Sequence, residues 1–191
     1  MVRNSFFRYI NGSSILVSGL LLTVFSFLLS GCFKDDNVDE LQQQQEEAFY
    51  KQLEVDTLLI KQHLAANNIT NAKKTANIIW YNDANKTANV IWYTEQVVGT
   101  GIQPQVGNRV RVNYTLSLLN GTALENGNYG PFTLGTRAVV DGFDYGIRTM
   151  KVGGKSRFYI PSGLGYGTAG SGSKIPPNTI LVFDIELLDA L

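Results

Sequence analysis

The residues best suited to chemistry lie near the end of the chain, between positions 163 and 188. Glycines flank Tyr166, so the backbone there can turn tightly and a guest molecule can approach closely. Two prolines follow Ile175 and stiffen the chain ahead of a run rich in β-branched and aromatic residues, which includes Phe183. A rigid loop carrying Tyr166 and Ile175 beside a strand carrying Phe183 would form the wall of a shallow apolar pocket.

Several classes of function are disfavoured by the sequence. From about position 95 onward there is no Ser/His/Asp set, no Cys/His pair and no phosphate loop. The chain has one cysteine and one histidine, His63, so no metal-ligand spacing exists and we expect neither a metal nor a cofactor. The formal net charge is zero, so the sequence lacks the excess of positive charge that nucleic-acid binding usually requires. Hydrophobic residues make up 44% of the chain, so a packed core is feasible.

Alternating hydrophobicity predicts the strands that must position the pocket. From Arg109 to Leu118, apolar residues such as Val110 and Tyr114 alternate with polar ones, as in an antiparallel strand with one wet face. Asn120-Gly121 then predicts a tight hairpin turn. Further strands are expected at 90–98, 132–135, 156–160 and 180–188.

One short helix is expected among these strands, at about residues 144–150. Asp141 is a candidate N-cap, and Phe143, Ile147 and Met150 would lie on one face. A single short helix among several antiparallel strands indicates the α+β class.

The chain from about residue 95 to 191 resembles the FKBP-type peptidyl-prolyl isomerases. The resemblance depends on Gly165-Tyr166-Gly167, on Ile175-Pro176-Pro177, and on the run from Leu181 to Leu188. It implies a curved antiparallel sheet wrapped around one short helix. It also implies peptidyl-prolyl cis-trans isomerisation of proline-containing polypeptides, with rapamycin-type macrolides as candidate ligands.

The resemblance also implies roles for nine pocket residues. Phe143 would be the aromatic floor, and the hydroxyl of Tyr166 would bond a ligand carbonyl. Val139 and Val140 would hold the ligand through backbone groups. The four catalytic candidates are Tyr114, Phe143, Tyr166 and Phe183, and the substrate-binding candidates are Leu124, Glu125, Val139, Val140 and Ile175.

One wall of the pocket departs from the family pattern. Leu124 replaces an aromatic residue and Glu125 replaces the usual aspartate, while 126–130 is short and has no arginine to pair with the acid. Tyr129 is a candidate substitute for an aromatic residue that is missing near Gly130. The altered wall favours an alternative function, in which the domain is a non-catalytic chaperone or binding module of the same fold.

Residues 1–31 have the pattern of a signal peptide. Arg3 and Arg8 precede an apolar stretch, and Leu29-Ser30-Gly31-Cys32 resembles a bacterial lipobox. Cleavage before Cys32 and acylation of that cysteine would anchor the chain to the outer membrane, facing the periplasm or the cell surface. The acidic residues of 33–37 resemble a Bacteroidetes-type surface export signal, or form a solvated tether. The alternative to cleavage is an uncleaved transmembrane anchor.

A polar tether at 32–40 and a helical extension at 41–71 are expected to follow. Phe49, Leu53, Ile60 and Leu64 form a narrow stripe along a helix predicted at 41–66. Such a stripe fits a helix that packs on its own domain or acts as a spacer, or else a dimerisation helix. His63 is expected to be packed or solvent-facing, without a catalytic role.

Residues 72–94 contain a short tandem repeat that leads into the core domain. Two copies of an Ala-Asn-aliphatic-Ile-Trp-Tyr pattern are offset by twelve residues. We interpret the repeat as a duplicated strand, whose copies could pair as a hairpin around 82–85. Trp80 and Trp92 could instead form a contact surface for a partner, which would make the domain a surface-layer interaction protein.

Overall fold

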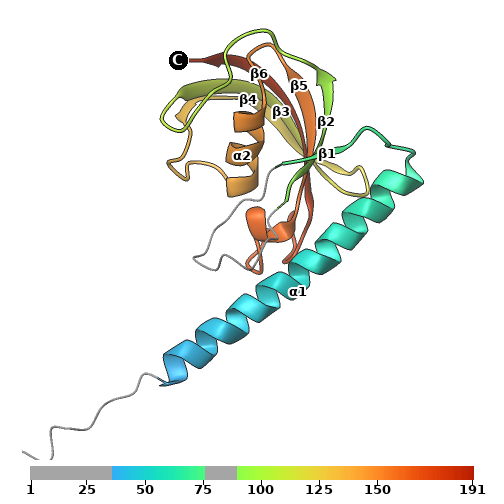
Figure 1. The fold of residues 1–191 in the computed structure, drawn as a ribbon, viewed down its shortest axis with the longest axis vertical. Helices are drawn as coiled ribbons and strands as arrows, with labels where there is room; N and C mark the ends of the chain where they lie inside the picture. Colours follow the sequence, from blue (N-terminus) through green and yellow to red (C-terminus); the bar gives the residue numbers. More distant parts are fainter. Residues whose placement is uncertain (1–35, 76–89) are drawn as a thin grey trace, which may run out of the picture. The chain divides into compact units, whose positions relative to one another are not determined.

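The computed structural model describes residues 36–75 and 90–191. Over these ranges the elements follow one another as shown in Figure 1. They are α1 (Asp36–Ala66), β1 (Lys73–Lys74), β2 (Trp92–Val97), β3 (Arg109–Leu118), β4 (Ala123–Thr133), α2 (Asp141–Thr149), β5 (Lys155–Ile160), the 3-10 turn η1 (Ser162–Leu164) and β6 (Leu181–Ala190). The leader, Cys32 and Trp80 lie outside the described residues.

The six strands form one antiparallel sheet in the order β1-β2-β5-β6-β3-β4. β6 lies between β5 and β3, so both of its backbone edges are paired. Leu116 pairs with Phe183 and Tyr114 pairs with Ile185 across the β3–β6 ladder. The buried faces predicted for both strands are confirmed: the buried residues include Val110, Val112 and Leu116 of β3 and Leu181, Phe183, Ile185 and Leu187 of β6.

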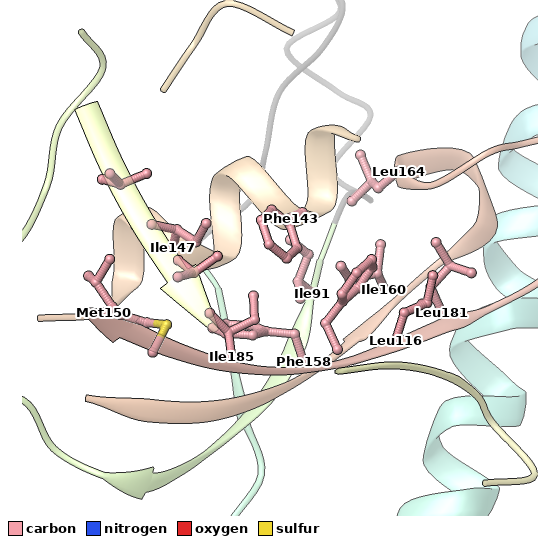
Figure 2. Packing of buried hydrophobic residues seen from close by; sticks show 14 of the residues in the cluster. Ile91, Leu116, Phe143, Ile147, Met150, Phe158, Ile160, Leu164, Leu181 and Ile185 are labelled. Atoms are coloured by element: carbon pink, nitrogen blue, oxygen red, sulfur yellow. The ribbon is translucent and has the colours of Figure 1, made fainter. Parts of the chain in front are cut away.

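Helix α2 lies inside the curve of the sheet (Figure 1). Phe143, Ile147 and Met150 are buried, and Figure 2 shows them directed toward Phe158 and Ile185 of the sheet. Gly142 permits this close packing, because a Cβ on it would lie 2.3 Å from Cγ2 of Ile160 on β5. The α+β fold with one short helix against a curved antiparallel sheet is thereby confirmed.

The start of α2 differs from the sequence prediction. The helix begins at Asp141, its N-cap is Val140, and no side chain caps it, so the prediction that Asp141 is the N-cap was wrong. Asp144 is used elsewhere, since its carboxylate accepts the Gly135 N–H at 2.7 Å and pairs with Arg148 at 3.0 Å. These contacts join α2 to the loop that precedes it.

Strand β4 is also longer than predicted. Only residues 132–135 were expected to be extended, but β4 pairs with β3 from Ala123 to Thr133. Its sequence contains Glu, Asn and Gly, which rarely favour strands, and most of its side chains are exposed. Pairing with β3 at the edge of the sheet therefore overrides a weak local preference.

Residues 41–66 of α1 pack within the same compact unit as the sheet. Ile60 and Leu64 are buried against Tyr159, Ile180 and Val182. Tyr159 and Val182 alternate with Phe158 and Phe183, so α1 covers the sheet face opposite to α2. α1 begins at Asp36, within the segment expected to be a tether. Within the described ranges, no helix has both the length and the apolar character that a membrane span needs.

The repeat region is only partly described. Lys73 and Lys74, at the start of the first copy, pair with Tyr93 and Trp92 at the end of the second. The Nζ of Lys74 lies 4.5 Å from the ring centroid of Trp92, a cation–π contact with this half-buried ring. The predicted hairpin turn at 82–85 lies outside the described residues.

Candidate active site

A pocket of about 200 Å³ opens between β3, β4, α2 and the loop after η1. Aromatic and aliphatic side chains form most of its wall, with one carboxylate at the edge. The lining residues are Tyr114, Leu116, Glu125, Tyr129, Ala138, Val139, Val140, Phe143, Tyr166 and Phe183.

Three aromatic rings pack edge to face at the bottom of the pocket. The centroid of Phe143 lies 4.8 Å from that of Phe183 and 6.0 Å from that of Tyr114. Phe143 is 4% exposed and Phe183 is 5% exposed, and both rings belong to the hydrophobic core. Tyr166 is 37% exposed and lies at the mouth, where a guest could meet its hydroxyl.

The one charged group of the lining is tied to a tyrosine. The hydroxyl of Tyr114 donates a hydrogen bond to Oε1 of Glu125. Burial, together with this bond, raises the pKa of Tyr114 to about 12. Tyr114 therefore keeps its proton at neutral pH, and the proton is directed at Glu125.

The loop that carries Tyr166 is held by its own backbone. The carbonyl of Ser162 accepts hydrogen bonds from Gly165 N–H at 2.9 Å and from Gly167 N–H at 2.8 Å. Gly170 N–H then bonds the carbonyl of Tyr166 at 3.1 Å. These bonds on both sides of Tyr166 fix where its ring leaves the backbone.

Seven of the nine predicted site residues meet in this pocket. They are Tyr114, Glu125, Val139, Val140, Phe143, Tyr166 and Phe183. The roles that the resemblance assigns to them stay predictions.

Leu124 and Ile175 are not part of the lining. Leu124 falls where the β3–β4 register shifts, since Leu116 pairs with Glu125 and Ser117 with Ala123; it packs against the core. Ile175 is 7% exposed and belongs to the core cluster, where backbone bonds to Ser171 hold it. Their contact with a substrate also stays a prediction.

Two lining residues were missed by the sequence reasoning. Leu116 is two residues after Tyr114 on the same strand face, so strand periodicity could have identified it. Ala138 directly precedes Val139 in the segment before α2, and no local sequence signal identifies it as a pocket residue. Tyr129, the candidate substitute for the missing aromatic, does line the pocket, with its ring 5.1 Å from that of Phe132.

A larger cavity, of about 670 Å³, lies between the end of α1 and the outer face of the sheet. Its lining includes His63, Arg157 and Asp184, but none of the predicted site residues. Burial and the nearby Arg157 cation lower the pKa of His63. Size alone would favour this cavity as the active site, whereas the convergent aromatic residues favour the smaller pocket as the active site. In the described part of the chain, no three His, Cys, Asp or Glu residues gather as a metal site would require.

The smaller pocket can bind an apolar group and a planar or twisted amide, with a hydroxyl at its mouth. A curved antiparallel sheet that encloses one helix and an aromatic pocket of this kind defines the FKBP class of fold. A family model described as "FKBP-type peptidyl-prolyl cis-trans isomerase" matches residues 100–188. FK506-binding protein 1 of Dictyostelium discoideum is 42% identical over 94 residues, which cover 47% of this chain and 88% of that protein. This chain belongs to the FKBP-type peptidyl-prolyl cis-trans isomerase family.

Other similar proteins are longer or cover more of this chain. FK506-binding protein 4 of Dictyostelium discoideum is 46% identical over 94 residues, and the match spans only 26% of that protein. A solved peptidyl-prolyl cis-trans isomerase from Pseudomonas syringae pv. tomato aligns with a TM-score of 0.56 and 29% identity, covering 74% of this chain and 94% of that one. The structural likeness thus covers more of this chain than the family model does.

Proposed function

We propose that this protein is a lipid-anchored peptidyl-prolyl isomerase that acts on X-Pro bonds of exported polypeptides. The observation that carries the proposal is the convergence of Phe143, Phe183, Tyr114 and Tyr166 on one pocket in a chain of this family. Rapamycin-type macrolides are proposed ligands of the same pocket.

The pocket chemistry suits rotation about an imide bond. Uncatalysed isomerisation takes tens to hundreds of seconds. Reaching a turnover of about 10 s⁻¹ then requires roughly a thousandfold acceleration, equal to about 4 kcal/mol. Removing the imide from water disfavours its polar planar form, and a site that binds the twisted form better lowers the barrier. The floor rings supply the apolar medium, and Tyr166 supplies a hydroxyl for the ligand carbonyl.

A proline-limited peptide isomerisation assay on the full-length chain, purified in detergent, tests this proposal. We expect Tyr166→Phe to lower kcat/KM by about tenfold, because it removes only the hydroxyl proposed to bond the ligand carbonyl and keeps the ring in the pocket lining. The matched control is Lys174→Ala, in the same loop and exposed but outside the pocket. A folded wild-type protein no faster than background would reject the enzymatic proposal.

The membrane anchor is a separate part of the proposal. Its support is the positive leader, the apolar stretch and the Leu-Ser-Gly-Cys sequence ending at Cys32. Cys32→Ser should abolish acyl labelling and leave the apolar leader uncleaved, so that the protein has a larger mass, with activity unchanged. Acyl label retained in this variant would contradict lipid attachment at Cys32. Protease treatment of intact cells would then distinguish a surface-facing domain from a periplasmic one.

A non-catalytic chaperone is the second candidate. The observation that favours it is the altered wall, where Leu124 is outside the pocket lining and Glu125 is engaged by Tyr114. A protein that suppresses aggregation of a proline-free client, binds a rapamycin-type macrolide and fails the peptide assay would have this function.

A further inference from the structure

A buried carboxylate on α1 contacts the segment that leads to Tyr166. Asp56 is 1% exposed, and its Oδ2 accepts hydrogen bonds from both the N–H and the Oγ–H of Ser162, each at 2.7 Å. Its Oδ1 accepts a bond from Nε2 of Gln52 at 2.8 Å. Burying a carboxylate is costly unless several hydrogen-bond donors satisfy it. The three donors to Asp56 therefore favour the arrangement in which α1 is docked against Ser162.

Ser162 is also the backbone anchor of the Tyr166 loop. Its carbonyl accepts from Gly165 N–H and Gly167 N–H, the two neighbours of Tyr166. A continuous series of hydrogen bonds therefore runs from Asp56 through Ser162 to both sides of Tyr166. Removing the Asp56 carboxylate would leave the N–H and the hydroxyl of Ser162, the first residue of this series, without their acceptor.

A second contact places α1 against the same turn. Phe49 lies seven residues before Asp56, about two helical turns away on the same face. Its ring packs so closely on Gly163 that a Cβ there would lie 2.3 Å from Cε2. Asp56 and Phe49 thus hold the two consecutive residues Ser162 and Gly163 from one helix face.

From these contacts we infer that α1 positions the active site from outside the pocket lining, although it also lies outside residues 100–188 that match the family model. Asp56 is a positioning residue, which acts through Ser162 to hold Tyr166 at the mouth of the pocket. This inference depends on the isomerase function proposed above, and it assigns a role in that function to the helical extension.

The test compares three variants of the full-length chain in detergent. Asp56→Ala removes the acceptor and should lower kcat/KM by roughly tenfold or more, since small misplacements of a binding group are expensive. Asp56→Asn keeps an oxygen that can accept from Ser162, with Gln52 free to turn its amide, and should restore most of the activity. Leu64→Ala is the matched control, because it weakens the packing of α1 on the sheet two turns beyond Asp56.

Amide hydrogen exchange over residues 162–170 provides a readout independent of activity. Asp56→Ala should speed exchange at Gly165 and Gly167, whereas Leu64→Ala with a similar loss in Tm should not. If Asp56→Ala fails to fold, Ser162→Ala takes its place, since it removes only the hydroxyl donor and should give a smaller change of the same kind.

Equal losses of kcat/KM in the Asp56 and Leu64 variants at equal Tm would overturn the inference, as would unchanged exchange in the Tyr166 loop. An inactive wild type whose loop exchange still responds to Asp56→Ala would support the positioning contact and reject the isomerase function. The two proposals can therefore fail separately.

Discussion

At the scale of single residues, the contact between Tyr114 and Glu125 decides how the pocket's edge behaves. The tyrosine hydroxyl is a donor to the carboxylate, so neither group is free to act alone on a ligand. Glu125 reaches Tyr114 diagonally across the β3–β4 ladder, where Glu125 itself pairs with Leu116. The Tyr114–Glu125 contact therefore closes this edge of the pocket.

The first prediction concerns the coupling of these two residues. Tyr114→Phe and Glu125→Ala should each lower kcat/KM, and the double variant should be little worse than the poorer single one. Because the pair is exposed at the pocket's edge, we expect a coupling energy of about 0.5–1 kcal/mol. A double-mutant cycle in the peptide assay measures it, and simple additivity would contradict the shared contact.

The second prediction concerns pH. The pKa of Tyr114 is raised to about 12, so the folded protein holds this proton more tightly than the unfolded chain does. The resulting stability is fully present below the ordinary tyrosine pKa near 10, and it is lost as the pH rises through about 12. Activity should show no break from this residue up to about pH 9. A pH profile in which a break near pH 9 disappears in Tyr114→Phe would contradict this assignment.

At the scale of elements, the pocket depends on how closely α2 approaches β5. Gly142 and Gly146 both face the sheet, and Phe143 lies between them in the sequence. The position of the pocket floor therefore depends on the distance between α2 and β5. Any side chain at position 142 or 146 would increase this distance.

The third prediction tests this spacing with Gly142→Ala. The added Cβ would lie 2.3 Å from Cγ2 of Ile160, so α2 must move outward and carry Phe143 with it. We expect a loss of about 1–3 kcal/mol in the free energy of unfolding, together with reduced kcat/KM. The control is Gly127→Ala in β4, where a Cβ would meet nothing within 4 Å. Equal stability of the two variants in urea unfolding would refute the close approach.

At the scale of the whole described molecule, residues 41–66 of α1 give the sheet a second covered face. α2 fills the inner curve, while Ile60 and Leu64 of α1 bury Tyr159 and Val182 on the outer face. The helical extension is thus part of the folded unit, and its end lies over the larger cavity beside His63.

The fourth prediction concerns acid stability. His63 shares its cavity with Tyr159 and with the Arg157–Asp184 ion pair, and burial and Arg157 lower the pKa of its ring. The unfolded chain therefore takes up this proton first as the pH falls. Stability is present above the unfolded value near 6.5 and is lost as the pH falls toward the folded pKa. His63→Gln should show a smaller fall in the free energy of unfolding from about pH 7.5 to about pH 5.5, measured by urea unfolding. An unchanged fall would contradict the shift.

Much of the fold could be predicted because its information is local. The alternation in Arg109–Leu118 gave the exact bounds of β3, and the apolar face at Phe143, Ile147 and Met150 identified α2. Local propensity failed for β4, whose polar sequence becomes a strand only because β3 offers it an edge. Local signals also misplaced the start of α2, which begins at Asp141 without a side-chain cap. The carboxylate of Asp144 instead accepts a hydrogen bond from the backbone of Gly135, outside the helix.

The sequence by itself determined which residues are apolar, where the chain turns and which short segments alternate, because these properties depend on neighbours a few positions away. Only the tertiary structure decided that seven of the nine predicted residues share one pocket, that Leu124 and Ile175 do not line it, and that Asp56 meets Ser162. The physical reason is separation along the chain: a hydrogen bond between residues 106 positions apart leaves no periodic or local signal, and it forms only when the sheet has brought both ends together.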